Sequence, residues 1–529
     1  MESGDSDEYQ ASPPPKRRRT GRATEYGFMR DAASGQESTH FLGSASGIYF
    51  IRNVSAVLAR NSASLGQALS PEAELVPGED DRLPNQEDNH HKTERLWQEN
   101  EILQDSNQAK SNQADNASVA TFEDLVKWSQ SYFKRWHMVF PYIHGPSMLH
   151  TFDRISNEGL GFLSSTEAII LRSIMSISTI DRRQKPKGHT RNSRGIPECL
   201  VFPTIQDALS ALEIALCKPT SIPIIQAAVS VQVFLISMLR YNSASRIGGL
   251  IVRMAYQLGL HRCPTRYSRF SPSEKQLRRR LFWSIYCIER HICQSLGLPL
   301  DIRDDDIDVC FPGHEEHVDI ANDPDDEENQ GNFLLYNHCN EITNIQKDGR
   351  LRLLTVLAKQ AKLKGMILEL RNKSLQHRKE NDEMATLIHA ELAKWWNEVQ
   401  DILDMDPWDN KQLGSGGDTD APLLHQSHKL LLLVLKQELI ISLNRPLLAS
   451  EKTSNSYAAA LQTCIGASQK IIHTLKKFLV KSSNSNADGS VKGHAVLVWP
   501  SLTSAVWMSC FVLIYAAFEG HFPIKSALR

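Results

Sequence analysis

One stretch near the middle of the chain constrains the fold more than any other, because helix-start and helix-stop signals stand at its two ends. The segment SPSE at residues 271–274 supplies an N-cap serine, a proline at the first helical position and a glutamate three residues after the cap. Apolar residues then recur at helical spacing as far as Leu296, and Gly297 and Pro299 follow. The pattern predicts one long helix that ends at Leu296.

Opposite faces of this helix carry different side chains. A helix with an apolar face and an arginine/aromatic face is typical of an element packed on both sides, so we expect a central helix of the domain. We also expect Arg279 and Arg290 to stack on the neighbouring rings and to reach a carboxylate, either Asp304 or Asp306. The apolar face holds Leu277, Leu281, Ile285, Ile288, Ile292 and Leu296, and the other holds Arg279, Trp283, Tyr286 and Arg290.

Helical periodicity recurs along most of the chain, and alternating strand patterns are scarce, which predicts an all-α fold. Residues 1–120 are rich in polar side chains, and we expect them to form a mostly disordered tail. Residues 121–529 are expected to form one large helical domain. Within it we expect a core at about 121–315, an acidic loop at 313–345 and a C-terminal helical half at 350–529.

Cysteine usage and charge exclude several classes of protein. The nine cysteines are an odd number, the first is Cys199, and no pair forms CxxC, so we expect no metal ligands and a reducing compartment. The formal net charge of -2 offers no general attraction for nucleic acid. The apolar run from Leu502 to Phe518 is short of the roughly 20 residues that cross a bilayer. We expect it to be a buried helix, and we expect no membrane contact.

A compact basic segment, PPPKRRRTGR, stands out in the mildly acidic N-terminal part. Its prolines keep the chain extended, which favours a nuclear import signal and a nuclear location, although a solvated charge run is the alternative. The basic residues are Lys16, Arg17, Arg18, Arg19 and Arg22.

The acidic cluster after the long helix permits an enzymatic alternative. Asp304, Asp305 and Asp308 satisfy a DDxxD pattern, which in all-helical terpenoid synthases binds magnesium and a diphosphate. Here the pattern follows Gly297 and Pro299, in a predicted loop, and no second metal motif accompanies it. Nucleophile, zinc-protease and phosphate-loop motifs are also missing from the sequence, so we expect no catalytic residue and no enzyme.

Two neighbouring segments resemble the middle homology region of fungal zinc-cluster transcription factors, the regulatory domain of the xylanolytic-activator type. They are RIGGLIVRMAYQLGLHR and SEKQLRRRLFWSIYCIERHICQSLGLPLDIRDDDIDVCFP. Weaker similarity occurs in HFLGSASGIYFI and SLNRPLL. The resemblance implies structural roles for His261, Arg278, Arg279, Arg280, Trp283, Arg290, Gly297, Pro299, Asp306 and Asp308.

The resemblance also implies a function. Members of the family regulate RNA polymerase II transcription, and the domain restrains or releases activation in response to a small molecule or a protein partner. Their DNA-binding module is a cluster of six cysteines and two zinc ions, and this sequence lacks it. We expect no cofactor in this chain. Promoter DNA is then reached through an upstream cluster, or the chain is a clusterless co-regulator that binds another transcription factor. The resemblance also implies a homodimer or a heterodimer.

Overall fold

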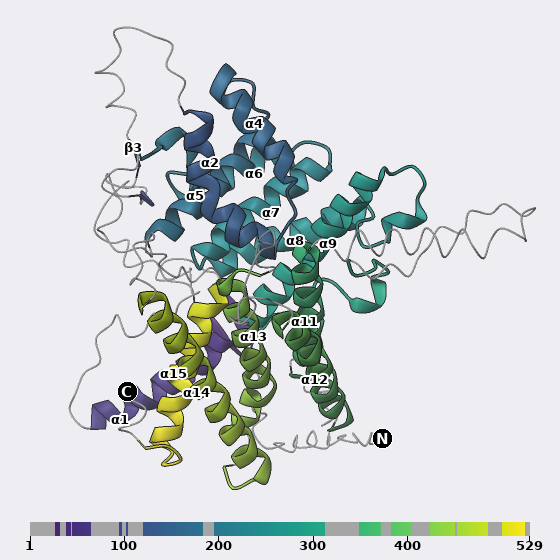
Figure 1. Ribbon diagram of the computed structural model, residues 1–529. Coiled ribbons are helices and arrows are strands. Elements are labelled where there is room, and N and C mark those ends of the chain that lie inside the picture. The colour runs from purple at the N-terminus through teal and green to yellow at the C-terminus, as the bar shows by residue number, and fades with distance from the viewer. Residues whose placement is uncertain are drawn as a thin grey trace, which may run out of the picture.

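The computed structural model describes residues 27–31, 39–43, 45–64, 95–97, 102–103, 120–183, 195–312, 349–371, 382–404, 424–449, 452–484 and 500–523. Helices dominate these residues (Figure 1), which confirms the predicted all-α class. The strands are short: β1 (Gly27–Asp31) pairs antiparallel with β2 (Thr39–Gly43), and β3 (Ile102–Leu103) pairs parallel with β4 (Ile196–Pro197). Helix packing therefore builds the core.

A first group of helices occupies the upper part of Figure 1. Its centre is α7 (Ile222–Ser237), which is apolar and buried on nearly all sides and packs against α5, α6 and α8. The group comprises α2 (Phe122–Ser131), a π-helical turn η4 (Tyr132–Trp136), α3 (His137–Val139), α4 (Gly145–Glu158), α5 (Ser165–Arg183), α6 (Ile205–Leu216), α7 and α8 (Tyr241–Gln257).

The long central helix, α9 (Pro272–Leu296), has the bounds that its end signals predicted. The Ser271 hydroxyl accepts a hydrogen bond from the Glu274 N–H at 3.3 Å, and Gly297 ends the helix with a left-handed φ of 70°. Side chains of both predicted faces are buried, among them Ile288 and Arg290. Because α9 packs against α8 on one side and α11 on another, it joins the two helix groups.

A second group of helices fills the lower part of Figure 1. Within it α14 packs against both α13 and α15, and α11 packs against α12 and α13. The group comprises α11 (Gly349–Arg371), α12 (Asp382–Asp404), α13 (Gln426–Asn444), a short turn η9 (Arg445–Ala449), α14 (Asn455–Asn484) and α15 (Pro500–Phe518).

The N-terminal helix α1 (Gly47–Ser64) lies beside these C-terminal helices in the lower part of Figure 1, whereas α2, which follows it in the sequence, lies in the upper part. It packs against α9 and α15, and Leu42, Ile48 and Ile51 are buried in the main hydrophobic core, as is Trp97. The packed core therefore extends N-terminal to the boundary expected at residue 121. These apolar residues are too few to fold alone, but they cover apolar surface that α9 and α15 expose.

Two glycines fix the place where the N-terminal segment meets the end of α9. A Cβ atom on Gly43 would lie 2.1 Å from the carbonyl oxygen of Gly297, far inside contact distance. A Cβ on Gly297 would lie 2.7 Å from the Gly43 oxygen, and the positive φ of Gly297 strains any other residue. The close approach of the two backbones requires glycine on both sides.

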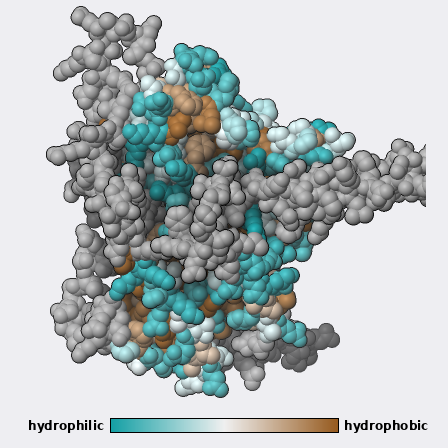
Figure 2. Space-filling view, viewed as in Figure 1, coloured by the Kyte–Doolittle hydropathy of each residue, from teal (hydrophilic) through white to brown (hydrophobic). Residues whose placement is uncertain are grey.

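The surface seen in Figure 2 is mainly hydrophilic, with separate apolar patches. Helix α15 buries Leu502, Ala505 and Val512 and packs against α1, α13 and α14, as expected for a buried helix. Among the described helices, none combines the length and the apolarity that crossing a membrane requires.

Candidate functional site

Arg290, on α9, is completely buried and connects this helix to the acidic segment that follows it. Its Nη2 donates hydrogen bonds to Asp304 Oδ1 at 2.7 Å and to the Ile302 carbonyl oxygen at 2.8 Å. The guanidinium carbon lies 4.3 Å from the centroid of the Tyr286 ring, and the Tyr286 hydroxyl donates to the same Asp304 oxygen at 2.7 Å. The contacts expected for Arg290, with a ring and with Asp304, are therefore present.

Glu289 provides a second, buried carboxylate for Arg290, whose Nη1 lies 2.5 Å from Glu289 Oε2. The other oxygen of Glu289 accepts hydrogen bonds from the Asp301 N–H at 2.7 Å and from the Cys293 thiol at 3.4 Å. The sequence did not predict this pair, since adjacent residues of a helix do not normally face each other. We call Glu289, Arg290, Asp301 and Asp304 the arginine junction.

Burial and charge act against each other in the arginine junction. Burial raises the pKa of Glu289, and the neighbouring guanidinium opposes that shift. Burial alone would lower the pKa of Arg290, but the carboxylates of Glu289 and Asp304, with Tyr286, raise it instead. The guanidinium thus stays charged, and it compensates a carboxylate that water cannot reach.

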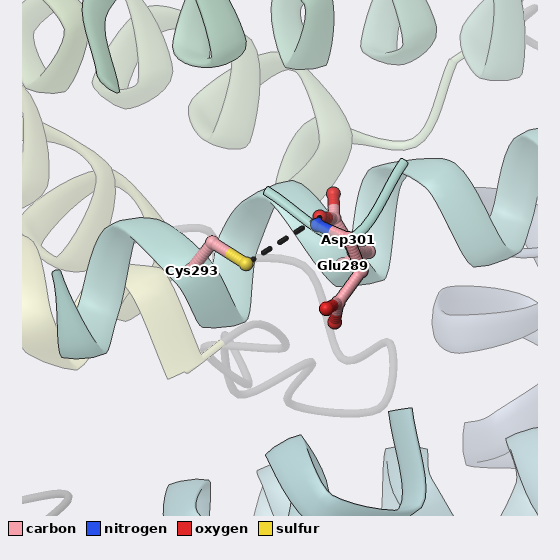
Figure 3. Close-up of side chains that lie close together, drawn as sticks. All are labelled: Glu289, Cys293 and Asp301. Atoms are coloured by element: carbon pink, nitrogen blue, oxygen red, sulfur yellow. Dashed lines mark hydrogen bonds between the residues drawn. The ribbon is translucent and has the colours of Figure 1, made fainter. Parts of the chain in front are cut away.

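Glu289, Cys293 and Asp301 also have ligand atoms that all lie within 4.8 Å of one another (Figure 3). A cation at this place would meet the positive charge of Arg290, which already occupies the Glu289 carboxylate. Burial raises the pKa of the Cys293 thiol, whereas metal binding requires a thiolate. The cluster is typical of a hydrogen-bonded link between helix and loop, and the expectation of no metal ligand stays a prediction.

Asp308 makes a second link, at the far end of the acidic segment. Its carboxylate accepts a hydrogen bond from the Cys263 N–H at 2.7 Å and lies 3.1 Å from Arg266 Nη1 and 3.6 Å from Arg262 Nη1. Its own N–H donates to the His261 carbonyl oxygen at 3.2 Å, and burial lowers the pKa of the His261 ring. These contacts hold the segment against the turn that follows α8.

Aromatic contacts complete this region. The Trp283 indole N–H donates to the Cys310 carbonyl oxygen at 3.0 Å, and its ring stacks on Phe311 with centroids 4.5 Å apart. The single proton of the Cys293 thiol is shared between Glu289 Oε1 and the Pro299 carbonyl oxygen, which lies 3.2 Å from the sulfur. The chain from Pro299 to Phe311 is thereby held along the side of α9.

The three successive arginines of α9 take different positions. Arg278 pairs with Glu274 at 3.2 Å, and its guanidinium carbon lies 4.0 Å from the Phe270 centroid. Arg279 is buried, with its Nε 3.5 Å from the Lys275 carbonyl oxygen, and Arg280 is partly buried. A helix that contacts DNA keeps its basic side chains in solvent. This turn is therefore part of the packed domain and does not form a nucleic-acid surface.

The geometry of the acidic cluster gives no support to the diphosphate alternative. Asp304 is bound by Arg290 and Tyr286, whereas Asp308 is bound by a separate pair of arginines. Asp305 and Asp306 lie in a short turn, η7 (Asp304–Asp306), with exposed side chains. Magnesium binding needs carboxylates that converge with free oxygens. Of the two carboxylates expected to reach Arg290, Asp304 does so and Asp306 is exposed.

Two parts of the sequence analysis fall outside the described residues. The acidic loop at 313–345 is one, and the basic segment with Lys16, Arg17, Arg18, Arg19 and Arg22 is the other. Their predicted roles stay predictions.

Two charged residues of the second helix group escaped prediction. Lys364 on α11 is 3% exposed, and burial lowers its pKa, while Glu438 opposes the shift. Burial raises the pKa of Glu438, on α13, to about 7. The sequence LAKQAKLKGMILEL of α11 places Lys359 and Lys362 on one side of the helix and Lys364 on another, so its pattern could not show which lysine points inward.

Comparison with known proteins connects this geometry to a family. Residues 129–397, about half of the chain, match the fungal specific transcription factor domain. That match includes α9, the arginine junction and most of α12.

Individual relatives extend the comparison. A probable transcription factor of Fusarium proliferatum, FUP6, is 26% identical over 93% of this chain and 71% of its own length. An ABC-transporter-regulating transcription factor of Aspergillus oryzae is 22% identical over 45% of this chain and 26% of its own length. Activator of stress genes 1 of Saccharomyces cerevisiae is 38% identical over 17% of this chain and 9% of its own length. The domain match and these similarities establish that the chain belongs to the fungal specific transcription factor domain family.

Proposed function

We propose that this chain regulates RNA polymerase II transcription in a fungal nucleus, with residues 121–529 as its regulatory domain. The observation that carries the proposal is the domain match over residues 129–397. The relatives described as transcription factors support it as well.

The packing around α9 suggests how such a domain works. Helix α9 contacts α1, α8 and α11, so any displacement of α9 reaches both helix groups. The arginine junction holds it against residues 301–304 through hydrogen bonds from Arg290 to Asp304 and the Ile302 carbonyl oxygen and from the Asp301 N–H to Glu289. We propose that this region transmits a signal between the groups and that it does so without catalysis and without a cofactor.

Promoter DNA can be reached in two ways. The six-cysteine zinc module that the family uses has no counterpart in a sequence whose first cysteine is Cys199. A zinc cluster upstream of these residues is one route to promoter DNA, and a second candidate function is that the chain binds another transcription factor as a co-regulator. Binding to immobilised promoter DNA, measured with and without a zinc-cluster protein, separates direct contact from contact through the partner.

A reporter assay tests regulation itself. The full chain, fused to a bacterial operator-binding domain, should change transcription of an operator-controlled reporter in yeast by several fold relative to that domain alone. Arg290→Ala should reduce the change, whereas Arg303→Ala, at a residue 74% exposed, should leave it intact. An output equal to that of the operator-binding domain alone would contradict the proposal.

Two further measurements address the location and the enzymatic alternative. Replacing the five basic residues of the segment at 16–22 by alanine should move a fluorescent fusion out of the nucleus. Incubation with farnesyl diphosphate and magnesium should give no product, and a released terpene would overturn the non-enzymatic function.

A further inference from the structure

Two cysteines that are 47 residues apart in the sequence, Cys263 and Cys310, have their sulfur atoms 3.7 Å from each other. Both side chains are buried, and both are present as thiols. Cys263 precedes a short turn, η6 (Pro264–Arg266), and Cys310 lies near the end of the segment that runs along α9. The sulfur atoms of a disulfide lie about 2.05 Å apart, so these two need to approach by only about 1.7 Å to bond.

Hydrogen bonds around the two cysteines hold their segments together. The Cys263 N–H donates to the Asp308 carboxylate at 2.7 Å, and the Asp308 N–H donates to the His261 carbonyl oxygen at 3.2 Å. On the other side, the Cys310 carbonyl oxygen accepts the Trp283 indole N–H at 3.0 Å. The short distance between the sulfurs therefore follows from the packing of both segments.

The surroundings of Cys263 favour the thiolate, which is the form of cysteine that reacts with oxidants. Hydrogen bonds with Cys310 and with Thr265, whose hydroxyl lies 2.8 Å from the Cys263 sulfur, lower the pKa of this thiol although burial acts in the opposite direction. Burial instead raises the pKa of the Cys287 and Cys464 thiols to about 12, as is typical of unreactive core cysteines.

The burial of the pair limits which oxidant can reach it. Cys263 is 0% exposed and Cys310 is 8% exposed, so the oxidant must be small. Hydrogen peroxide is small and oxidises thiolates to sulfenic acids. In a compartment that keeps most thiols reduced, disulfides are usually transient and serve catalysis or redox sensing.

We propose that Cys263 and Cys310 form a reversible oxidation site, which hydrogen peroxide converts from two thiols to a disulfide. The Cys263 thiolate attacks one peroxide oxygen, and the O–O bond breaks to leave a sulfenic acid on Cys263 and a hydroxide ion. The hydroxide takes the proton of Cys310 and becomes water. The Cys310 thiolate then attacks the Cys263 sulfur and displaces a second hydroxide, which takes up the proton that Cys263 had lost. Two thiols and one peroxide thus give one disulfide and two water molecules, and two electrons pass from sulfur to oxygen.

The disulfide adds a covalent bond to the link that Asp308 makes between the turn after α8 and the acidic segment. Because residues 263–310 include all of α9 and the arginine junction, the bond closes a loop around both. Oxidation therefore restricts the displacement of α9 relative to α8. The inference goes beyond the proposed function and does not depend on it, since the oxidation needs neither DNA nor a partner.

Peptide mapping of the purified full chain tests the site. The chain is reduced with dithiothreitol, freed of the reductant and treated with hydrogen peroxide at neutral pH, and the remaining thiols are alkylated. Digestion with trypsin and an aspartate-specific protease should then yield residues 263–266 joined to residues 308–318, and renewed reduction should separate them. The same treatment of the chain unfolded in urea should distribute Cys263 among several partners, because the folded contact is lost.

Variants of the chain assign the two roles. Cys310→Ser should stop the reaction at the sulfenic acid of Cys263, which dimedone traps as an adduct found by mass spectrometry. Cys217→Ser is the matched control, because it removes an exposed thiol elsewhere, and it should form the disulfide to the same extent as the wild type. If Cys310→Ser does not fold, Cys310→Ala offers the same measurement, and the peptide map of the wild type decides independently of both.

Three results would overturn the inference. The first is a folded wild-type chain that forms no link between Cys263 and Cys310, and the second is one that links Cys263 to other cysteines as often as to Cys310. The third is a dimedone adduct in Cys310→Ser that lies on other cysteines and is missing from Cys263. The proposed function would survive each of them, and a failed reporter assay would leave the peptide map valid.

Discussion

Replacing Arg290 by alanine tests the central packing argument directly. The substitution removes the cation 2.5 Å from the buried Glu289 carboxylate and leaves the carbonyl oxygen of Ile302 without its donor. Breaking a buried ion pair by removing one partner costs about 3–5 kcal/mol of stability. We expect a loss of this size in the free energy of unfolding.

The loss should depend on pH, because Glu289 can escape an uncompensated charge by taking up a proton. From its ordinary pKa of 4.5, protonation costs about 5 kcal/mol at pH 8 and about 1 kcal/mol at pH 5.5. In the variant, the folded-state pKa of Glu289 lies further above the unfolded value, so stability is lost as pH rises. The destabilisation should therefore be larger at pH 8 than at pH 5.5 by up to about 3 kcal/mol.

Urea unfolding followed by tryptophan fluorescence, at both pH values, measures the effect. Arg303→Ala is the control, because Arg303 is 74% exposed and its pair with Asp305 is 3.8 Å long, so it should change stability by less than about 0.5 kcal/mol. Adding Glu289→Gln to Arg290→Ala should restore part of the loss at pH 8. A loss no greater than that of the control, or an equal loss at both pH values, would refute the reasoning.

Three other substitutions have calculable outcomes. Gly365→Ala places a Cβ atom 2.8 Å from Arg290 Nε, so it should destabilise by about 1–3 kcal/mol in urea unfolding, and it should become neutral or stabilising in the Arg290→Ala background. In the wild type, Glu438 has its pKa raised to about 7, so the free energy of unfolding falls by about 3 kcal/mol as pH rises from 5 to 8. Glu438→Gln removes this titration and should flatten the pH dependence of the melting temperature, and a parallel fall in the variant would contradict this. Gly43→Ala, whose Cβ would meet the Gly297 oxygen at 2.1 Å, should expose α1 to limited proteolysis while the rest of the protein stays resistant.

The sequence determined the elements whose signals are local. The bounds of α9 follow from the serine cap, the proline and the terminal glycine, each of which acts within one helical turn. Helical spacing predicts that both faces of α9 are buried and that Arg290 lies beside the Tyr286 ring. The short connection after α9 brings Asp304 within reach of Arg290. The all-α class follows from the same periodicity repeated along the chain.

Tertiary structure alone decided the features that depend on surfaces brought from far apart in the sequence. The apolar residues of α1 looked too sparse for a core until α9 and α15 supplied the matching surface. One oxygen of Glu289 pairs with Arg290, and the other accepts the backbone N–H of Asp301. The pair therefore depends on how the segment after α9 folds back against the helix. Lys364 and Glu438 line one small cavity because α11 and α13 pack together. Burial, which gives these charges their energetic weight, is a property of the assembled helices, and no short stretch of sequence encodes it.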